Sequence, residues 1–404
     1  MILKKYEINF IKEEYTSGID NVITFSDLDN DGIDEKIIIH DNDFGDASFD
    51  LIKSGEEFVD QFNFEGKFPT KFKYIWFKDL NGNGYQEVVL LTQINDSLFI
   101  NIKEPLLKNG LNRNKIFVDR ISSYKSQYEI HANGIWSFDR YQDSLNNLYF
   151  SINAGFAGNP RSIYKYDFNK NKITKSPHLT NTSSISELTN LDDDDELEVI
   201  VSNYAAQNTL DTLFTKKSDY SSWLIILDDD LNYMFDQIEY KVKSGPIGKS
   251  VISDDGTKHV AVLQKTYGDN SFPSQLLKLS HKGEILLTKQ LIKSNYGNLI
   301  NNDNKIYLTD VLNQKCLQFN SNLELIEEYQ LDRFYNLKIA NVGASKSKEF
   351  ITIYNNNEVT IYDLNFNHKT QFNLNFKNDK SDPNYEITKD KKGELIIYFQ
   401  KGSI

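Results

Sequence analysis

The chain has 404 residues, of which 39% are hydrophobic and 13% aromatic, and its formal net charge at pH 7 is −13. This composition can supply a large apolar core, while the acidic balance argues against a nucleic-acid partner. No apolar run approaches the ~20 residues of a membrane helix, so we expect no membrane insertion, and the single cysteine, Cys316, excludes an internal disulfide.

The N-terminal stretch Leu3–Ile11 precedes the first repeat unit of the chain. Lysine, glutamate and asparagine interrupt it, so it lacks the continuous apolar segment of a secretory signal peptide. We therefore expect a strand without a sequence-adjacent partner at this end of the chain.

An oxygen-rich loop follows, flanked by Val22–Phe25 and Lys36–Ile39. These flanks are rich in β-branched residues and read as strands. An EF-hand would carry a glutamate at position 12, where this loop has Ile38, so the loop joins two strands rather than two helices. Calcium prefers such oxygen cages, and we expect the carbonyl of Ile33 to add a ligand. The side-chain ligands, at positions 1, 3, 5 and 9, are Asp27, Asp29, Asp31 and Glu35.

The same pattern returns twice. One Asp/Asn/Gly-rich hairpin is ordinary turn chemistry, but three copies with a glutamate at one fixed offset predict one to three calcium ions. Position 6 is Gly32, Gly84 and Asp195, and there we expect a positive φ. Ligand charge helps to set affinity, so we rank the first loop above the third and the third above the second. The second set is Asp79, Asn81, Asn83, the carbonyl of Tyr85, and Glu87; the third is Asn190, Asp192, Asp194, the carbonyl of Glu196, and Glu198.

The loops also reveal a repeat that runs along the whole chain. Their first positions are residues 27, 79 and 190, and further strands follow each loop, such as Trp223–Leu227 and Tyr233–Ile238. Four short strands per unit of roughly 40 to 60 residues predict an all-β chain folded as a β-propeller. Eroded copies of the loop, which we expect to bind no metal, lie within 136–152, 251–262, 299–308, 339–354 and 386–399.

The two ends of the chain suggest how the ring closes. The last unit has only the strands Tyr385–Ile387 and Glu394–Phe399, which Leu3–Ile11 could complete. We expect eight four-stranded blades in a single domain over residues 1–404, with one blade shared between the N- and C-termini. Seven blades is the alternative, because the strands of 295–350 are poorly marked.

Catalytic signatures are weak, since the chain has no nucleophile elbow, phosphate-binding glycine loop or dinucleotide fingerprint. We expect a non-enzymatic module, with a lyase-type polysaccharide-active enzyme as the alternative. Long connections at 153–161, 203–222 and 265–275 could form a surface for a protein or carbohydrate partner, or could simply pack over the end of the ring. Their candidate binding residues, which we expect to be exposed, are Phe156, Arg161, Tyr204, Tyr267 and Phe272.

The three loops resemble the FG-GAP/VCBS repeat, Asp-x-Asp-x-Asp-Gly-x-x-Asp/Glu between two strands, found in integrin α-chains and bacterial surface proteins. The match covers 27–35, 79–87 and 190–198, but the Phe-Gly and Gly-Ala-Pro marks are absent, so the resemblance is to a divergent member. Residues 203–208 and 221–232 resemble propeller sensor regions of bacterial membrane-bound signalling proteins. The resemblance implies a sensing or adhesive role, and calcium favours an extracytoplasmic setting, although a cytoplasmic one also fits a chain without a signal peptide.

Overall fold

A computed structural model of the chain describes residues 22–40, 45–53, 57–69, 75–123, 140–142, 146–154, 158–192, 194, 196–205, 217–240, 245–265, 273–292, 296–302, 304–334, 336–341, 348–354, 358–373, 384–389 and 395–400. They belong to two compact units, one made of Met1–Phe64 with Asp332–Ile404 and the other of Glu65–Leu331.

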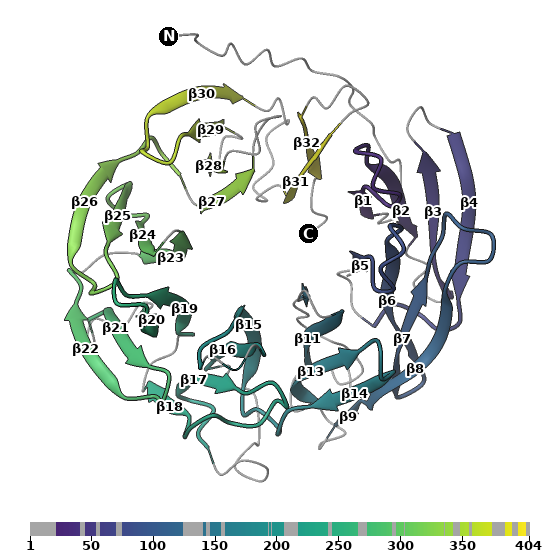
Figure 1. The fold of residues 1–404 in the computed structure, drawn as a ribbon, viewed down its shortest axis with the longest axis horizontal. Coiled ribbons are helices and arrows are strands. Elements are labelled where there is room, and N and C mark those ends of the chain that lie inside the picture. The colour runs from purple at the N-terminus through teal and green to yellow at the C-terminus, as the bar shows by residue number, and fades with distance from the viewer. Residues whose placement is uncertain are drawn as a thin grey trace. The chain divides into compact units, whose positions relative to one another are not determined.

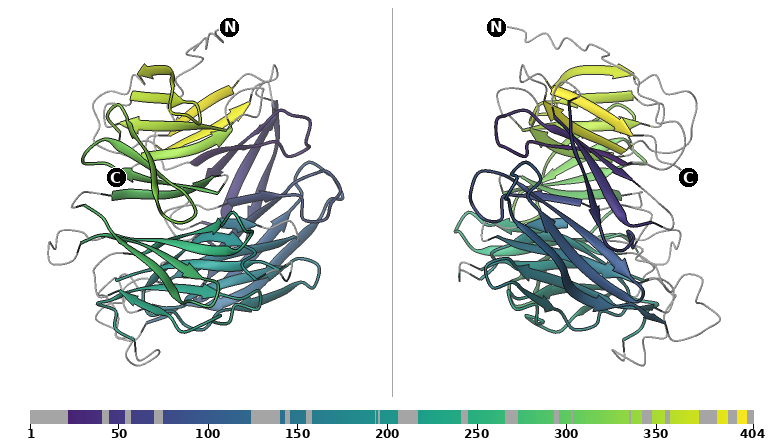
Figure 2. Two further views of the ribbon diagram at one scale, coloured as in Figure 1. Left: turned by 60° about the vertical axis from the view of Figure 1, so that its left-hand side comes forward. Right: turned by 90° about the vertical axis from the view of Figure 1, so that its right-hand side faces the viewer.

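The described residues are all-β and contain no helix (Figure 1). Seven sheets have four antiparallel strands, and in each sheet the strands pair in chain order. This four-stranded meander is the blade of a β-propeller, which confirms the predicted fold class. Figure 2 shows the same sheets from two other sides, with the twist that paired strands normally adopt.

The first unit contains two full sheets and one pair of strands. In this unit β1 contacts β31, so strands from the two ends of the chain meet. The predicted contribution of Leu3–Ile11 lies outside the described residues. The strands are β1 (Val22–Ser26), β2 (Glu35–His40), β3 (Ala47–Lys53), β4 (Glu57–Phe64), β27 (Asn336–Asn341), β28 (Lys348–Tyr354), β29 (Glu358–Tyr362), β30 (His368–Asn373), β31 (Asn384–Lys389) and β32 (Leu395–Gln400).

The second unit contains the other five four-stranded sheets and a small pair, β9 with β12. The strands are β5 (Ile75–Lys78), β6 (Glu87–Ile94), β7 (Ser97–Lys103), β8 (Asn112–Arg120), β9 (Ser122–Ser123), β10 (Arg140–Gln142), β11 (Asn147–Asn153), β12 (Gly158–Asn159), β13 (Arg161–Asp167), β14 (Lys172–Lys175), β15 (Thr182–Thr189), β16 (Glu198–Tyr204), β17 (Ser222–Leu227), β18 (Ile238–Tyr240), β19 (Ile247–Ile252), β20 (Lys258–Gln264), β21 (Gln275–Ser280), β22 (Ile285–Gln290), β23 (Tyr296–Asn302), β24 (Lys305–Asp310), β25 (Lys315–Phe319) and β26 (Leu325–Gln330).

Neighbouring sheets of the second unit pack face to face, and each interface is an apolar cluster with residues from two successive sheets. The second strands are therefore covered on both faces, and β6 and β20 read as nearly continuous apolar runs. The fourth strands β8, β22 and β26 are mostly exposed. In Figure 1 these fourth strands lie on the outer side of the unit and the first strands β15, β19 and β23 on the inner side.

The described residues of the region 295–350, which is poorly marked in the sequence, form β23–β27 and the start of β28, so the part of the chain that the structure describes contains seven full units and one incomplete unit. The prediction of a strand over Tyr233–Ile238 is wrong, because β18 begins only at Ile238. Its apolar residues pack into the core instead, Tyr233 in one cluster and Met234 in the next, and Tyr233 makes a single isolated bridge with Leu227.

Candidate metal centre

The three predicted loops share one hydrogen-bonded frame. Each joins the first and second strands of a sheet, and its position-9 glutamate is the first residue of the second strand. That glutamate is 0–3% exposed, and its Oε2 accepts a hydrogen bond from the backbone N–H of a buried leucine at position 2. The pairs are Leu28 with Glu35 (2.8 Å), Leu80 with Glu87 (2.7 Å) and Leu191 with Glu198.

Side chains at positions 1 and 5 hold the turn of the first two loops, and the side chain at position 5 holds the turn of the third. The N–H at position 7 donates to the position-5 side chain in all three loops, over 2.8–2.9 Å. In the first two loops the N–H at position 6 also donates to the position-1 aspartate. Gly32 and Gly84 have φ of 89° and 92°, as predicted from the sharp turn. Asp195, which takes this position in the third loop, lies outside the described residues.

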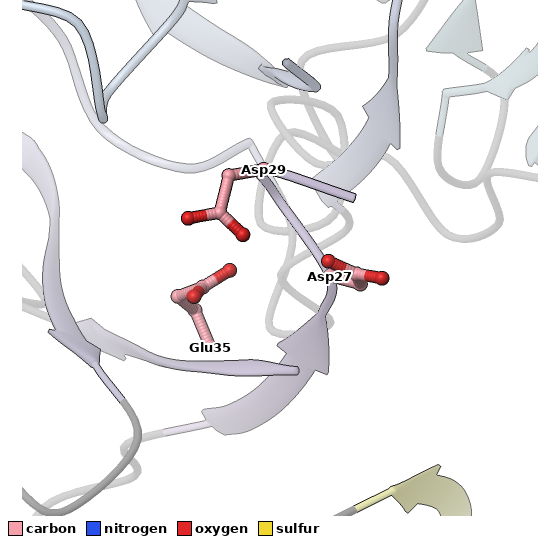
Figure 3. A group of neighbouring side chains, drawn as sticks. All are labelled: Asp27, Asp29 and Glu35. Carbon is pink, nitrogen blue, oxygen red and sulfur yellow. The ribbon is translucent and has the colours of Figure 1, made fainter. Parts of the chain in front are cut away.

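In the first loop three carboxylates converge. One oxygen each of Asp27, Asp29 and Glu35 lies within 4.8 Å of the others, and Figure 3 shows the carboxylates of Asp29 and Glu35 facing each other. Calcium with ligands at about 2.4 Å fits this spacing, since opposite ligands are then about 4.8 Å apart. The Oδ1 of Asp29 is buried and accepts no hydrogen bond from the described residues, so a cation would satisfy it. Asp31 is more exposed and stays outside this group.

The electrostatics of the first loop also favour a cation. Burial is the main cause that raises the pKa of Glu35 to about 7; the nearby Asp29, Asp31 and Asp27 carboxylates contribute to this rise, while the Leu28 N–H acts in the opposite direction. Burial is also the main cause that raises the pKa of Asp27. A divalent cation would remove this repulsion and stabilise the ionised carboxylates.

The third loop has a similar carboxylate group and one cationic neighbour. Oxygens of Asp192, Asp194 and Glu198 lie within 4.8 Å of one another. Burial is the main cause that raises the pKa of Glu198 to about 7, and the charges of Asp192 and Asp194 contribute to this rise. Lys258, the first residue of β20 in the next sheet, donates to the Oδ1 of Asn190 at position 1. Calcium ligation by Asn190 would therefore require the Lys258 ammonium to move.

The second loop is closed by amide groups. The Asn81 Nδ2 donates to Glu87 Oε1 and the Asn83 Nδ2 donates to Glu104 Oε1, both over 2.5 Å. Burial is the main cause that raises the pKa of Glu87 to about 7, and the Glu104 charge contributes to this rise. Amide N–H donors thus satisfy the carboxylates of this loop without a cation. It forms no group of three converging carboxylates among the described residues, so it remains the weakest of the three candidates.

Sequence reasoning missed three charged neighbours of these loops. Strand register places two of them beside the position-9 glutamates. The pairing of Lys36 with Ile52 puts Lys53 opposite Glu35, and the pairing of Val88 with Lys103 puts Glu104 opposite Glu87. Lys53 lies 3.8 Å from Asp29. Lys258 comes from a different sheet, so only the packing of two sheets reveals it. The carbonyl ligands of Ile33, Tyr85 and Glu196 remain predictions.

One eroded copy shows how the cation can be replaced. Asn341 and Glu349 occupy positions 1 and 9 of this copy, and Glu349 is 1% exposed like its counterparts. The Lys369 Nζ donates to Glu349 Oε1 over 2.6 Å. A lysine ammonium therefore neutralises the buried glutamate in this sheet.

The predicted partner surface is described only in part. Phe156, Tyr267 and Phe272 lie outside the described residues. Arg161 is 1% exposed, so the expectation that it is exposed is wrong: it begins β13 and pairs with the equally buried Asn153 of β11. Tyr204 is half-buried at the end of β16, and its ring lies where a Cβ on Gly245 would be.

No helix among the described residues is long and apolar enough to cross a membrane. No protein-family model matches the sequence, and no curated protein matches it. Three solved structures illustrate the similarity found at the level of the backbone. BamB from Moraxella catarrhalis has 14% identity over 94% of this chain and 100% of its own, with a TM-score of 0.46. The dihydro-heme d1 dehydrogenase NirN has 9% identity over 83% of this chain and 63% of its own, with a TM-score of 0.47.

Virginiamycin B lyase from Staphylococcus aureus has 12% identity over 76% of this chain and 85% of its own, with a TM-score of 0.40. All three TM-scores are below 0.5, so these similarities carry no argument about what the chain does. The fold class follows from the sheets of this chain themselves.

Proposed function

We propose that this chain is a non-enzymatic, calcium-stabilised recognition module of a bacterial cell envelope, for ligand sensing or adhesion in an extracytoplasmic setting. The proposal of calcium binding rests on one observation. Three carboxylates, one of them a buried glutamate, converge in the loop between the first and second strands of two sheets. The resemblance of the loops to FG-GAP/VCBS repeats supports the recognition part. Free calcium outside the cytoplasm is high enough to fill sites of modest affinity.

Calcium would act by joining two strands and removing like-charge repulsion. A ligand that binds only the folded chain stabilises it by about 2.7 kcal/mol when its concentration is 100 times its Kd. We expect the first and third loops to bind one ion each, and the second, closed by Asn81 and Asn83, to bind more weakly.

The test is calcium titration calorimetry together with thermal melting in calcium and in EGTA. We expect Glu35→Gln and Glu198→Gln each to abolish one binding event and part of the calcium-dependent rise in Tm. Glu57→Gln is the matched control, because Glu57 is an exposed glutamate on β4. The calcium part is wrong if the wild-type chain melts at the same temperature in both solutions and binds no ion.

The recognition part is tested separately by offering acidic polysaccharides to the purified chain. Release of unsaturated sugar products would favour the lyase alternative. An intact polysaccharide after prolonged incubation, together with binding of a partner, would favour a recognition module.

A further inference from the structure

The outer strands of two neighbouring sheets enclose a cleft that none of the metal loops lines. β8 and β14 form its walls, and its volume is about 590 Å³. Both strands lie on the outer side of the second unit in Figure 1. This volume is within the range of roughly 300–1,000 Å³ that is usual for ligand sites.

The lining of the cleft combines an apolar floor with a cationic rim. Val118 is buried, and the half-buried Ile116 and Ile173 pack against the same core cluster. The exposed part of the lining contains three lysines, namely Lys115, Lys172 and Lys175. Apolar floors with a few charged groups at the rim are typical of sites that bind an amphipathic segment.

The charge of this region opposes that of the rest of the molecule. Residues 112–120 and 170–175 carry six basic side chains and one acidic side chain, in a chain with a net charge of −13. Two of the rim lysines have local partners, since Lys115 pairs with Glu65 and Lys175 lies 2.5 Å from Asp119. Lys172 makes no ion pair with the described residues. The region stays net positive, so it is complementary to an acidic ligand.

An irregular backbone conformation at the rim sets the direction of the Lys115 side chain. Lys115 has φ of 56°, in the left-handed region that a residue with a side chain rarely adopts, and the register of β8 shifts nearby. Its N–H donates to Asn101 Oδ1 over 3.0 Å instead of continuing the ladder. Bulges of this kind redirect a side chain, and here the redirected lysine lines the cleft.

We propose that this cleft binds an extended, acidic peptide segment of a partner protein, in which apolar side chains alternate with glutamate or aspartate. Alternate side chains of an extended chain point in opposite directions, so one set meets the floor of Ile116, Val118 and Ile173 while the other meets the rim lysines. The apolar floor favours a peptide over a nucleic acid or an acidic polysaccharide, which expose few apolar groups. The inference names the partner class for the proposed recognition role and does not depend on calcium.

The test is fluorescence anisotropy of the full chain with a labelled peptide of alternating valine and glutamate. We expect binding that weakens about fivefold to tenfold in Lys115→Gln/Lys172→Gln, because two charge contacts are lost, and that weakens with added salt. Lys172→Glu is a second variant, chosen because Lys172 has no ion pair with the described residues to lose. The matched control is Lys282→Gln/Lys305→Gln, which removes two exposed lysines outside the cleft and should leave binding unchanged.

Control ligands separate the contributions of charge and apolar surface. Peptides of alternating valine with lysine, and of alternating serine with glutamate, should bind at least several-fold more weakly. Equal binding by wild type and both cleft variants, with their melting unchanged, would overturn the proposal. Tighter binding of polygalacturonate or of an oligonucleotide at the same lysines would also overturn it. Peptide binding that persists in EGTA would support the cleft even if the calcium proposal failed.

Discussion

At the scale of single residues, a buried glutamate is the repeated element of this protein. Glu35, Glu87, Glu198 and Glu349 are all 0–3% exposed at position 9 of their copies. A buried carboxylate must be neutralised, paired or protonated. An amide side chain donates a hydrogen bond to Glu87, and a lysine ammonium donates one to Glu349. Glu35 and Glu198 instead lie close to other carboxylates. This difference is why calcium is proposed for the first and third loops.

The pH dependence of the metal-free chain follows from these residues. Glu35, Glu87 and Glu198 have pKa values raised to about 7, so the folded chain keeps protons that the unfolded chain, with ordinary values of 4.5, has already released. The contribution of these groups to the free energy of unfolding therefore falls as the pH rises from about 4.5 to 7. In EGTA, Glu35→Gln should gain in Tm relative to wild type between about pH 5 and pH 8. A difference between the two proteins that is constant with pH would contradict this prediction.

Because Lys369 pairs with the buried Glu349, we expect replacement of this one lysine to lower the stability of the chain strongly. Lys369→Ala leaves the buried Glu349 carboxylate without its ammonium partner, and we expect a loss of about 3 kcal/mol in the free energy of unfolding. Urea denaturation measures it. The double variant Lys369→Met/Glu349→Met should recover most of that loss, because no buried charge remains. If Lys369→Ala and the double variant are equally unstable, the loss of stability comes from packing and not from the buried charge.

At the scale of elements, the inner strands of successive sheets are tied together by side chains. Glu187 lies at a bulge in β15, and its carboxylate accepts from the Ser250 N–H (2.5 Å) and hydroxyl (3.0 Å) on β19 and from Asn301 Nδ2 (2.8 Å) on β23. One side chain thus joins three sheets. These contacts complement the apolar clusters that fill the space between the sheets.

Replacing Glu187 should therefore destabilise the second unit. Glu187→Ala removes three hydrogen bonds and leaves their donors partly buried, for an expected cost of about 2–3 kcal/mol. Glu284→Ala, at an exposed turn between β21 and β22, is the control and should cost little. Chemical denaturation gives both values, and an equal effect of the two substitutions would argue against an inter-sheet role for Glu187.

At the scale of the whole molecule, the candidate sites are distributed between the two compact units. The first loop belongs to one unit, and the second and third loops to the other. The net charge of −13 would fall to −7 with three calcium ions bound. Binding at separate places should therefore stabilise both units by reducing repulsion within each of them.

Hydrogen exchange can follow the two units in one experiment. We expect calcium to slow amide exchange in 22–40 and in 182–204, with a smaller effect in 75–94, because Asn81 and Asn83 already close the second loop. Glu35→Gln should remove the protection in 22–40 and leave that in 182–204. Loss of protection in both segments would mean that the two sites are coupled.

Features that depend on short-range order along the chain could be predicted from the sequence. Strand alternation and the loop spacing predict the sheets, the loops and their glutamates, because neighbouring residues on one chain fix these patterns. It also predicted the positive φ of Gly32 and Gly84.

Contacts between residues of different sheets depend on how the sheets pack, and the sequence did not reveal them. Packing buries Arg161 and turns the apolar residues after Asn232 into core rather than strand. It brings Lys258 to the third loop and forms the cleft between β8 and β14. Local propensity carries no information about such contacts, because burial and charge pairing between distant segments arise only when the sheets pack together.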